Sequence, residues 1–196
     1  MNLIIFGPPG AGKGTQADFI VSKYNLYQLS TGEVLRNEIN NKTELGKKIS
    51  SIINSGSLVS DDIVRKLVEG FISDKKYKNR LIFDGYPRNL IQAKTLKELL
   101  SKYGQKIDLV LKLSVSLETI TKRIVERRTL EKRADDSEEI AIKRYNTYEK
   151  STEPMIEYYK KLNLLKVVNG ESSISEIICV IRNNYKKNFR KTNYRK

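Results

Sequence analysis

The sequence contains no histidine and a single cysteine, Cys179, and both shortages limit the chemistry that the chain can perform. Without histidine, neither an imidazole general base nor a Ser-His catalytic pair can form. One cysteine allows no intrachain disulfide, and without further cysteine or histidine ligands we expect no structural zinc. Since one unpaired thiol is typical of a reducing compartment, we expect a cytoplasmic protein.

Long hydrophobic runs are also absent. The apolar stretches have the length of single strands, far short of the roughly 20 residues that a membrane span needs. The first residues, Met1 to Phe6, carry no basic side chain before they reach Gly7, unlike a signal peptide. We therefore expect no membrane partner, and a length of 196 residues predicts one domain of ordinary size.

Acidic residues are fewer than basic ones, 23 against 37, so the formal net charge is +14. The last 15 residues, from Arg182 to Lys196, hold seven basic side chains and no acidic one. A basic chain can bind nucleic acid, phosphorylated metabolites or an acidic surface, and charge alone does not choose among them. A solvated basic tail is the simplest interpretation of the C-terminus.

Short β-branched apolar runs alternate with long amphipathic stretches, a pattern typical of an α/β fold in which helices cover both faces of a parallel sheet. Capping-box spacing predicts helix starts at Ser30, Asp136 and Ser173, and an acidic first turn predicts another after Ser60. The fold class that we predict is α/β with a five-stranded parallel sheet. Its expected strands are Leu3 to Phe6, Tyr27 to Leu29, Leu81 to Phe83, Leu109 to Leu113, and Leu164 to Val168.

Two segments interrupt this alternation. The stretch between the second and third strands is too long for a tight crossover, so residues 30–59 are predicted to form a helical insertion. Residues 128–136 are polar and poor in apolar side chains, which predicts a flap between two helices. The helices expected between the second and third strands are Thr31 to Asn40, Thr43 to Asn54, and Asp61 to Ile72.

A glycine-rich segment, Gly7 to Thr15, follows the first strand and opens a stretch of helical period, Gln16 to Tyr24. A phosphate-binding loop (P-loop) requires this context. Glycines let backbone N–H groups approach an anion, the helix N-terminus adds partial positive charge, and Lys13 reaches the β and γ phosphates. Most P-loops place the hydroxyl that binds Mg²⁺ at position 14, but this chain has Gly14 there and Thr15 next.

Charged residues later in the chain are also suited to binding phosphate groups and Mg²⁺. Asp84 ends the third expected strand, where a carboxylate beside a P-loop can hold Mg²⁺ directly or through water. Arg123 and Arg127 are one helical turn apart, and Arg133 and Arg144 follow. Guanidinium groups bind phosphate and stabilise a transferring phosphoryl group, whereas surface salt bridges are the simpler interpretation of any single arginine.

These motifs resemble those of a known family. The segment GPPGAGKGTQ (residues 7–16) is similar to the P-loop of nucleoside monophosphate kinases. DGYPR (84–88) followed by Gln92 resembles the signature of adenylate kinases, and STGEVLR (30–36) does so too, with Glu33 where Asp is usual. The resemblance extends from Met1 to about Tyr185. The long lid with a cysteine zinc site is missing, so the chain resembles the short-lid type.

The resemblance implies reversible, Mg²⁺-dependent phosphoryl transfer from ATP to AMP, giving two ADP. It implies a P-loop kinase core (1–29, 60–127 and 137–185), an AMP-binding insertion (30–59), a short lid (128–136) and a basic tail (186–196). The implied partners are these nucleotides, with no obligatory protein partner and no nucleic acid, and we expect a monomer. The implied metal site is Asp84, which would hold Mg²⁺ through water.

The resemblance also assigns roles to individual residues. The catalytic residues that it implies are Lys13, Arg88, Arg127, Arg133 and Arg144. The implied ATP site contains Gly10, Ala11, Gly12, Lys13, Gly14, Thr15, Arg123, Arg127 and Gly170. The implied AMP site contains Thr31, Arg36, Ser57, Leu58, Val59, Gly85, Tyr86, Pro87, Arg88, Gln92, Arg133 and Arg144.

Two other functions stay open on the sequence alone. A P-loop kinase for UMP, CMP or another small molecule would share most of these motifs, although Thr31 and Gln92 favour adenine. Gln92 lies one helical turn beyond Arg88, so its carboxamide can face the same cleft and pair with the base. A nucleic-acid binder would use the basic surface and show a steep dependence of affinity on salt.

Overall fold

The protein is described by a computed structural model over residues 1–131, 137–172, 175–176, 178–180 and 182–183. The elements follow the predicted order of strands and helices. They are β1 (Leu3–Phe6), α1 (Lys13–Tyr24), β2 (Tyr27–Ser30), α2 (Thr31–Asn40), α3 (Glu44–Asn54), α4 (Asp61–Ser73), the 3₁₀ turn η1 (Lys75–Tyr77), β3 (Leu81–Asp84), α5 (Leu90–Lys102), β4 (Leu109–Ser114), α6 (Leu117–Glu131), α7 (Glu138–Lys161) and β5 (Leu165–Asn169).

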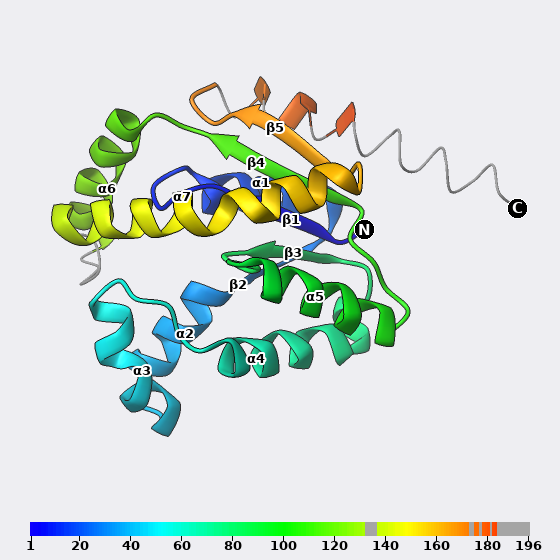
Figure 1. Ribbon diagram of the computed structural model, residues 1–196, viewed down its shortest axis with the longest axis horizontal. Coiled ribbons are helices and arrows are strands. Elements are labelled where there is room, and N and C mark those ends of the chain that lie inside the picture. Colours follow the sequence, from blue (N-terminus) through cyan, green and yellow to red (C-terminus); the bar gives the residue numbers. More distant parts are fainter. Residues whose placement is uncertain (132–136, 173–174, 177, 181, 184–196) are drawn as a thin grey trace, which may run out of the picture.

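The strands form one parallel sheet in the order β2-β3-β1-β4-β5 (Figure 1). Strand β1 is central and pairs with β3 and β4, so that Ile5 lies between Asp84 and Leu111. The chain fills the β2 side of β1 first and then crosses to the β4 side. Parallel sheets bind ligands beyond the carboxyl ends of the strands where the order reverses in this way. The five-stranded parallel sheet is confirmed, and the P-loop lies at this reversal.

Side chains of β1 enter two cores, because successive residues of a strand point to opposite faces of the sheet. Ile4 and Phe6 pack in the core that also contains buried residues of α2, α3, α4, α5 and α7. Leu3 and Ile5 pack in the other core, which α1 covers with residues such as Ile20. Helices therefore lie on both faces of the sheet, as predicted (Figure 1).

The predicted helical insertion contains α2 and α3, which pack tightly against each other. A Cβ atom at Gly46 would lie 2.1 Å from the carbonyl oxygen of Glu38, so only glycine permits this approach. The Thr43 hydroxyl accepts a hydrogen bond from the Gly46 backbone N–H at 3.0 Å and caps α3. Buried Leu35 and Ile49 anchor the two helices to the larger core.

Several boundaries differ from the predictions. Helix α1 begins at Lys13 rather than Gln16, because the left-handed backbone of the P-loop ends at Gly12. Helix α6 continues through Glu131, so residues 128–131 of the expected flap are helical rather than part of a loop. That prediction treated polarity as a sign of a loop, but α6 contains neither glycine nor proline and its last turns consist largely of good helix formers. Residues 132–136 lie outside the described residues.

The predicted caps are only partly correct. Helix α7 begins after Ser137, whose hydroxyl accepts from the Ile140 N–H at 3.4 Å, and not after Asp136. Ser30 and Ser60 do precede described helices, but neither side chain makes a cap hydrogen bond there. Ser173 lies outside the described residues. Strands β2, β3 and β4 each extend one residue beyond the expected end, and β5 is shifted by one.

None of the helices in the described part of the chain combines the length and the apolar character that crossing a bilayer requires.

Candidate active site

The loop between β1 and α1 has the backbone that a phosphate-binding loop needs. Gly10 and Gly12 have φ angles of 81° and 85°, in the left-handed region that favours glycine. The Ala11 N–H donates to the Pro8 carbonyl at 3.1 Å and closes the turn. A Cβ atom at Gly10 would lie 3.0 Å from Ile124 of α6, so the loop is also fitted against that helix. The N-terminus of α1 follows directly and adds positive potential.

Lys13 lies on the first turn of α1 and bends back over the loop. Its ammonium group donates to the carbonyl oxygens of Gly7 at 2.8 Å and Pro8 at 3.0 Å. Burial lowers the pKa of Lys13 from 10.5 to about 8; the Asp84 carboxylate opposes this shift, and three arginines reinforce it. These arginines are Arg88, Arg144 and Arg127. The positive potential of these arginines, which disfavours a further cation, favours the arrival of an anion.

Asp84 ends β3 beside the P-loop strand. Its side chain is buried and accepts a hydrogen bond from the Gln28 amide nitrogen at 3.0 Å. The carboxylate is the group that raises the pKa of Lys13, so the two charges are close enough to interact. The structure therefore brings the predicted metal-site carboxylate and the P-loop lysine together at one edge of the sheet. Gln28 is a neighbour that sequence reasoning missed.

The helical insertion, α4 and the loop after β3 form one of two adjoining pockets, which we call the second pocket or acceptor pocket. The Thr31 hydroxyl donates to the Gly85 carbonyl at 3.0 Å, and the Arg88 Nε–H donates to the same oxygen at 2.7 Å. These bonds join the start of α2 to the loop after β3. The predicted acceptor-site residues that line this pocket are Thr31, Arg36, Ser57, Leu58, Val59, Gly85, Arg88, Gln92 and Arg144.

Gln92 lies in the wall of this pocket, with only 4% of the residue exposed. Its carboxamide oxygen accepts from the Arg88 backbone N–H at 2.7 Å. Its amide nitrogen donates to the carboxylate of Asp61 at 2.6 Å. The predicted position beside Arg88 is confirmed, but the structure adds a partner, Asp61, that the sequence did not suggest.

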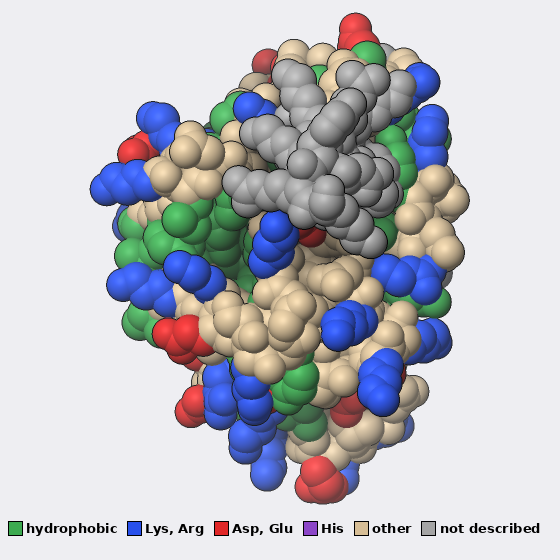
Figure 2. Space-filling model, turned by 90° about the vertical axis from the view of Figure 1, so that its right-hand side faces the viewer, with side chains coloured by type: hydrophobic (Ala, Val, Ile, Leu, Met, Phe, Trp, Pro, Cys, Tyr) green, Lys and Arg blue, Asp and Glu red, His purple; other side chains and the backbone are tan. Residues whose placement is uncertain are grey.

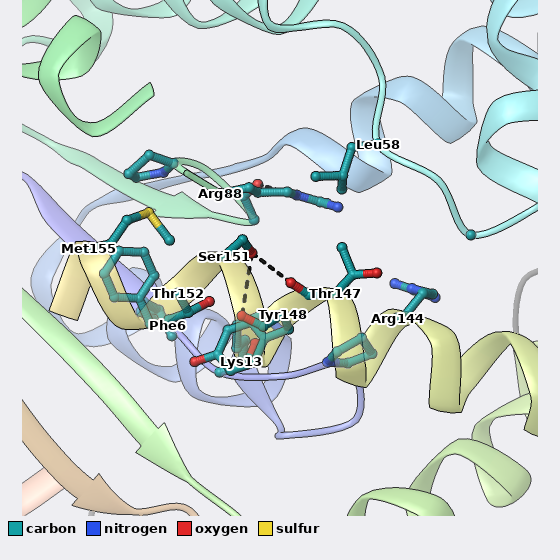
Figure 3. Close-up of a pocket in the computed structure, with 16 residues that line it drawn as sticks. Phe6, Lys13, Leu58, Arg88, Arg144, Thr147, Tyr148, Ser151, Thr152 and Met155 are labelled. Atoms are coloured by element: carbon teal, nitrogen blue, oxygen red, sulfur yellow. Dashed lines mark hydrogen bonds between the residues drawn. The ribbon is translucent and has the colours of Figure 1, made fainter. Parts of the chain in front are cut away.

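A first pocket lies between the P-loop and α7, and it adjoins the second (Figure 3). Lys13 and Pro9 line it from the P-loop side. Figure 3 shows Arg88 reaching into this region from the loop after β3, and Arg144 from α7. The residues that line both pockets are Gly56, Leu58, Gly85, Arg88 and Arg144. The two cavities therefore meet at two arginines.

One face of α7 forms much of the first pocket, and sequence reasoning found only Arg144 on it. The Ser151 hydroxyl donates to the carbonyl oxygens of Thr147 at 2.8 Å and Tyr148 at 3.3 Å (Figure 3). Burial raises the pKa of the Tyr148 phenol, so the group stays neutral. The signal was present in the spacing, because these residues recur at helical intervals after Arg144. The lining residues of this face are Thr147, Tyr148, Ser151, Thr152 and Met155.

The implied ATP-site residues away from the loop also come together. The Arg123 guanidinium of α6 donates to the Gly170 carbonyl at 3.3 and 3.4 Å and lies next to Gly12. A Cβ atom at Gly170 would be 2.5 Å from Val115, so glycine is required there. Glu171 accepts from the Ser116 hydroxyl at 2.6 Å and backbone N–H at 2.9 Å, and these bonds lower the pKa of Glu171 to about 2.

Two implied residues of the acceptor site are placed differently. The Tyr86 ring lies in the larger core with 1% exposure and does not belong to the described lining of either pocket. Pro87 lines the first pocket and not the second. Arg133 lies outside the described residues. Arg127 lies one turn after Arg123 on α6 and is close enough to lower the pKa of Lys13.

Comparison with known proteins agrees with this geometry. A sequence model of the adenylate kinase family matches residues 5–164. An adenylate kinase of Pelagibacter ubique is 43% identical over 203 aligned positions, which cover 90% of this chain and 95% of the relative. One of Fusobacterium nucleatum is 41% identical (90% and 94% covered), and one of Fervidobacterium nodosum is 40% identical (93% and 96% covered). With a P-loop and an acceptor pocket that meet at two arginines, and with relatives of this similarity along nearly its whole length, the chain belongs to the adenylate kinase family.

Proposed function

We propose that the enzyme transfers the γ-phosphoryl group of ATP to AMP, reversibly and with Mg²⁺, in the two adjoining pockets. ATP places its phosphates on residues 10–15 of the P-loop, and AMP binds on the side of the helical insertion. The observation that carries this proposal is that Arg88 and Arg144 line both pockets. Guanidinium groups at the boundary fit a phosphoryl group that passes from one nucleotide to the other.

The chemistry needs little from the protein besides position and charge. The attacking phosphate oxygen of AMP is already anionic at neutral pH, so a chain without histidine can perform the reaction. Two polyphosphates repel each other, and Lys13, Arg88 and Arg144 reduce this repulsion. The pockets align the reacting groups and exclude the water that would otherwise hydrolyse ATP.

The residues beside the P-loop fit a magnesium ion. Mg²⁺ prefers oxygen ligands, keeps several waters and is commonly held by one or two carboxylates together with substrate phosphates. Asp84 offers a buried carboxylate with one bond to Gln28, and it lies near Lys13. We propose that Asp84 holds the ion through water. When bound with ATP, the ion neutralises charge on the β and γ phosphates.

We propose the remaining roles from the same arrangement. Arg123 and Gly170 hold the adenosine end of ATP, and Arg127 and Arg133 stabilise the transferring group. Residues 30–59 form the AMP-binding unit, 128–136 the short lid, and 1–29, 60–127 and 137–185 the core, with a basic tail at 186–196. Closure of a lid over the nucleotides is an established feature of adenylate kinases.

The setting in which the enzyme works is also part of the proposal. Residues of one chain line both pockets, so the reaction needs no second copy to complete the site, and we propose a monomer. The free thiol of Cys179 is exposed, which is compatible with a reducing compartment such as the cytoplasm. We propose that the enzyme serves nucleotide biosynthesis there, with ATP, AMP and ADP as its partners.

A kinase for UMP, CMP or another small acceptor is the alternative that shares this site. Gln92 supports AMP, because its carboxamide lies in the wall of the acceptor pocket and can pair with adenine. A nucleic-acid role has less support. On the face shown in Figure 2, where β1 begins, Lys and Arg side chains lie at many separate places among neutral and apolar surface.

Substitution of Arg144 tests the proposal. Arg144→Ala removes a charge from the boundary of the two pockets, and kcat is expected to fall by about 10²- to 10³-fold, as for other charge stabilisers. Arg65→Ala is the matched control, because this arginine is partly exposed, lies outside the lining of both pockets and pairs with Glu69 at 3.7 Å on α4. Both variants should melt near the wild-type temperature. An Arg144→Ala enzyme that keeps more than about a tenth of the rate would contradict the placement.

A further inference from the structure

Gln92 is held from two sides in the wall of the acceptor pocket. Its carboxamide oxygen accepts from the Arg88 N–H at 2.7 Å, and its amide nitrogen donates to Asp61 at 2.6 Å. Asn89 adds an amide group 3.3 Å from both Asp61 oxygens and also caps α5 through its own carbonyl. The N-termini of α4 and α5 therefore meet at the carboxylate of Asp61.

The two bonds select one orientation of the carboxamide. If the amide turned over, its oxygen would face the Asp61 carboxylate, and its NH₂ group would face the Arg88 N–H. Both contacts would be repulsive and both hydrogen bonds would be lost. Because Asp61 is a charged acceptor, its bond to the amide is the stronger kind. Gln92 is nearly buried, so solvent offers its amide few other partners.

The orientation of the Gln92 carboxamide determines which purine base it can pair with. Beyond the two bonds, a carboxamide has a second N–H and a second oxygen lone pair. When the 6-position of the base lies on the side of the carboxamide oxygen, these groups pair in the observed orientation with an amino group beside a ring nitrogen that accepts, which is the edge of adenine. The same amide turned over would pair with a carbonyl beside a ring N–H, which is the edge of guanine.

We propose that Asp61 is a specificity-determining positioning residue, which holds the carboxamide of Gln92 in the orientation that accepts a 6-amino purine and rejects a 6-oxo purine. The inference rests on the proposed function, because it assumes that the acceptor base lies beside Gln92. Asp61 does not touch the substrate in this account and acts only through Gln92.

Asp61→Asn tests the orientation with little change in shape. The Asn carbonyl can still accept from Gln92, but its NH₂ group can also donate to a turned amide, so the selection is weakened. We expect the ratio of Kd for GMP to Kd for AMP, measured by calorimetry without ATP, to fall by about tenfold, the effect of one hydrogen bond. The KM for AMP should rise while kcat stays within twofold of wild type.

Two controls distinguish a change in the orientation of the Gln92 carboxamide from general damage to the protein. Asp62→Asn removes the same charge from the neighbouring position of α4, which is exposed as Asp61 is, and should leave the ratio unchanged. In a Gln92→Ala background, Asp61→Asn should have no further effect on the ratio, as a double-mutant cycle requires. The cycle stays informative if Gln92→Ala alone weakens AMP binding, because it compares ratios within one background.

Three results would overturn the inference. They are an unchanged GMP-to-AMP ratio in Asp61→Asn, an equal fall in Asp62→Asn, or the same fall in the Gln92→Ala background. A wild-type enzyme that does not use AMP would overturn the proposed function together with the inference. A wild-type preference for AMP that is unchanged in size in Asp61→Asn would overturn the inference alone.

Discussion

The lowered pKa of Lys13 predicts that affinity for ATP depends on pH in a range where ATP itself does not titrate. The ammonium group has a pKa of about 8 in the free protein, compared with 10.5 for an ordinary lysine. Below pH 8 the group is charged before ATP arrives. Above pH 8 it must first take up a proton, because the bound phosphates favour the charged form. The Kd for Mg-ATP should therefore rise about tenfold between pH 7 and pH 9.

Calorimetry of Mg-ATP binding without an acceptor measures this effect from pH 7 to pH 9.5. In buffers of different ionisation enthalpy, binding above pH 8 should show uptake of about one proton. Lys13→Arg is the control, because a guanidinium group stays charged throughout this range and should give a flat profile. A wild-type Kd that stays constant up to pH 9.5, with no proton uptake, would refute the assignment of this pKa and of the role of Lys13.

Three further predictions concern single parts of the site and the tail. Lys13→Ala should abolish turnover at a nearly unchanged Tm, and more than about a tenth of the wild-type rate would count against the P-loop assignment. Asp84→Asn should raise the Mg²⁺ concentration needed for half-maximal rate, whereas an unchanged requirement would argue against a metal role. Removal of the residues after Tyr185 should leave kcat/KM nearly intact, and a large loss would show that the tail contributes to the core or to substrate binding.

The parts of the fold and site that depend only on residues close together in the sequence could be predicted. β-branched runs such as Leu3–Phe6 form strands wherever they are covered on both faces, so the parallel sheet was predictable. The P-loop has a local signal, because the backbone needs glycine at φ angles such as those of Gly10 and Gly12. The continuation of α6 past Arg128 was not predictable from polarity, because charged residues without glycine or proline continue a helix.

Contacts between distant segments needed the structure. The resemblance named Arg88 and Arg144, but their common position at the boundary of two pockets depends on how α7 crosses the sheet. The same crossing brings Tyr148 to the P-loop. The bond between Gln92 and Asp61 joins residues 31 positions apart on two helices, and no local pattern indicates it. Local sequence motifs identify the chemical groups of the site, but the packing of distant helices and strands determines which of these groups lie close together.

The proposed acceptor is AMP, bound in the pocket that contains Gln92, which meets the P-loop pocket at Arg88 and Arg144. The most direct test is a coupled assay of phosphoryl transfer from Mg-ATP to AMP, UMP, CMP and GMP under one set of conditions. A pyrimidine would leave the Gln92 amide incompletely paired, which costs roughly 1 to 3 kcal/mol, so kcat/KM for AMP should exceed that for CMP and UMP by about tenfold to a hundredfold. Equal use of CMP or UMP would contradict the claim and show a broader nucleoside monophosphate kinase.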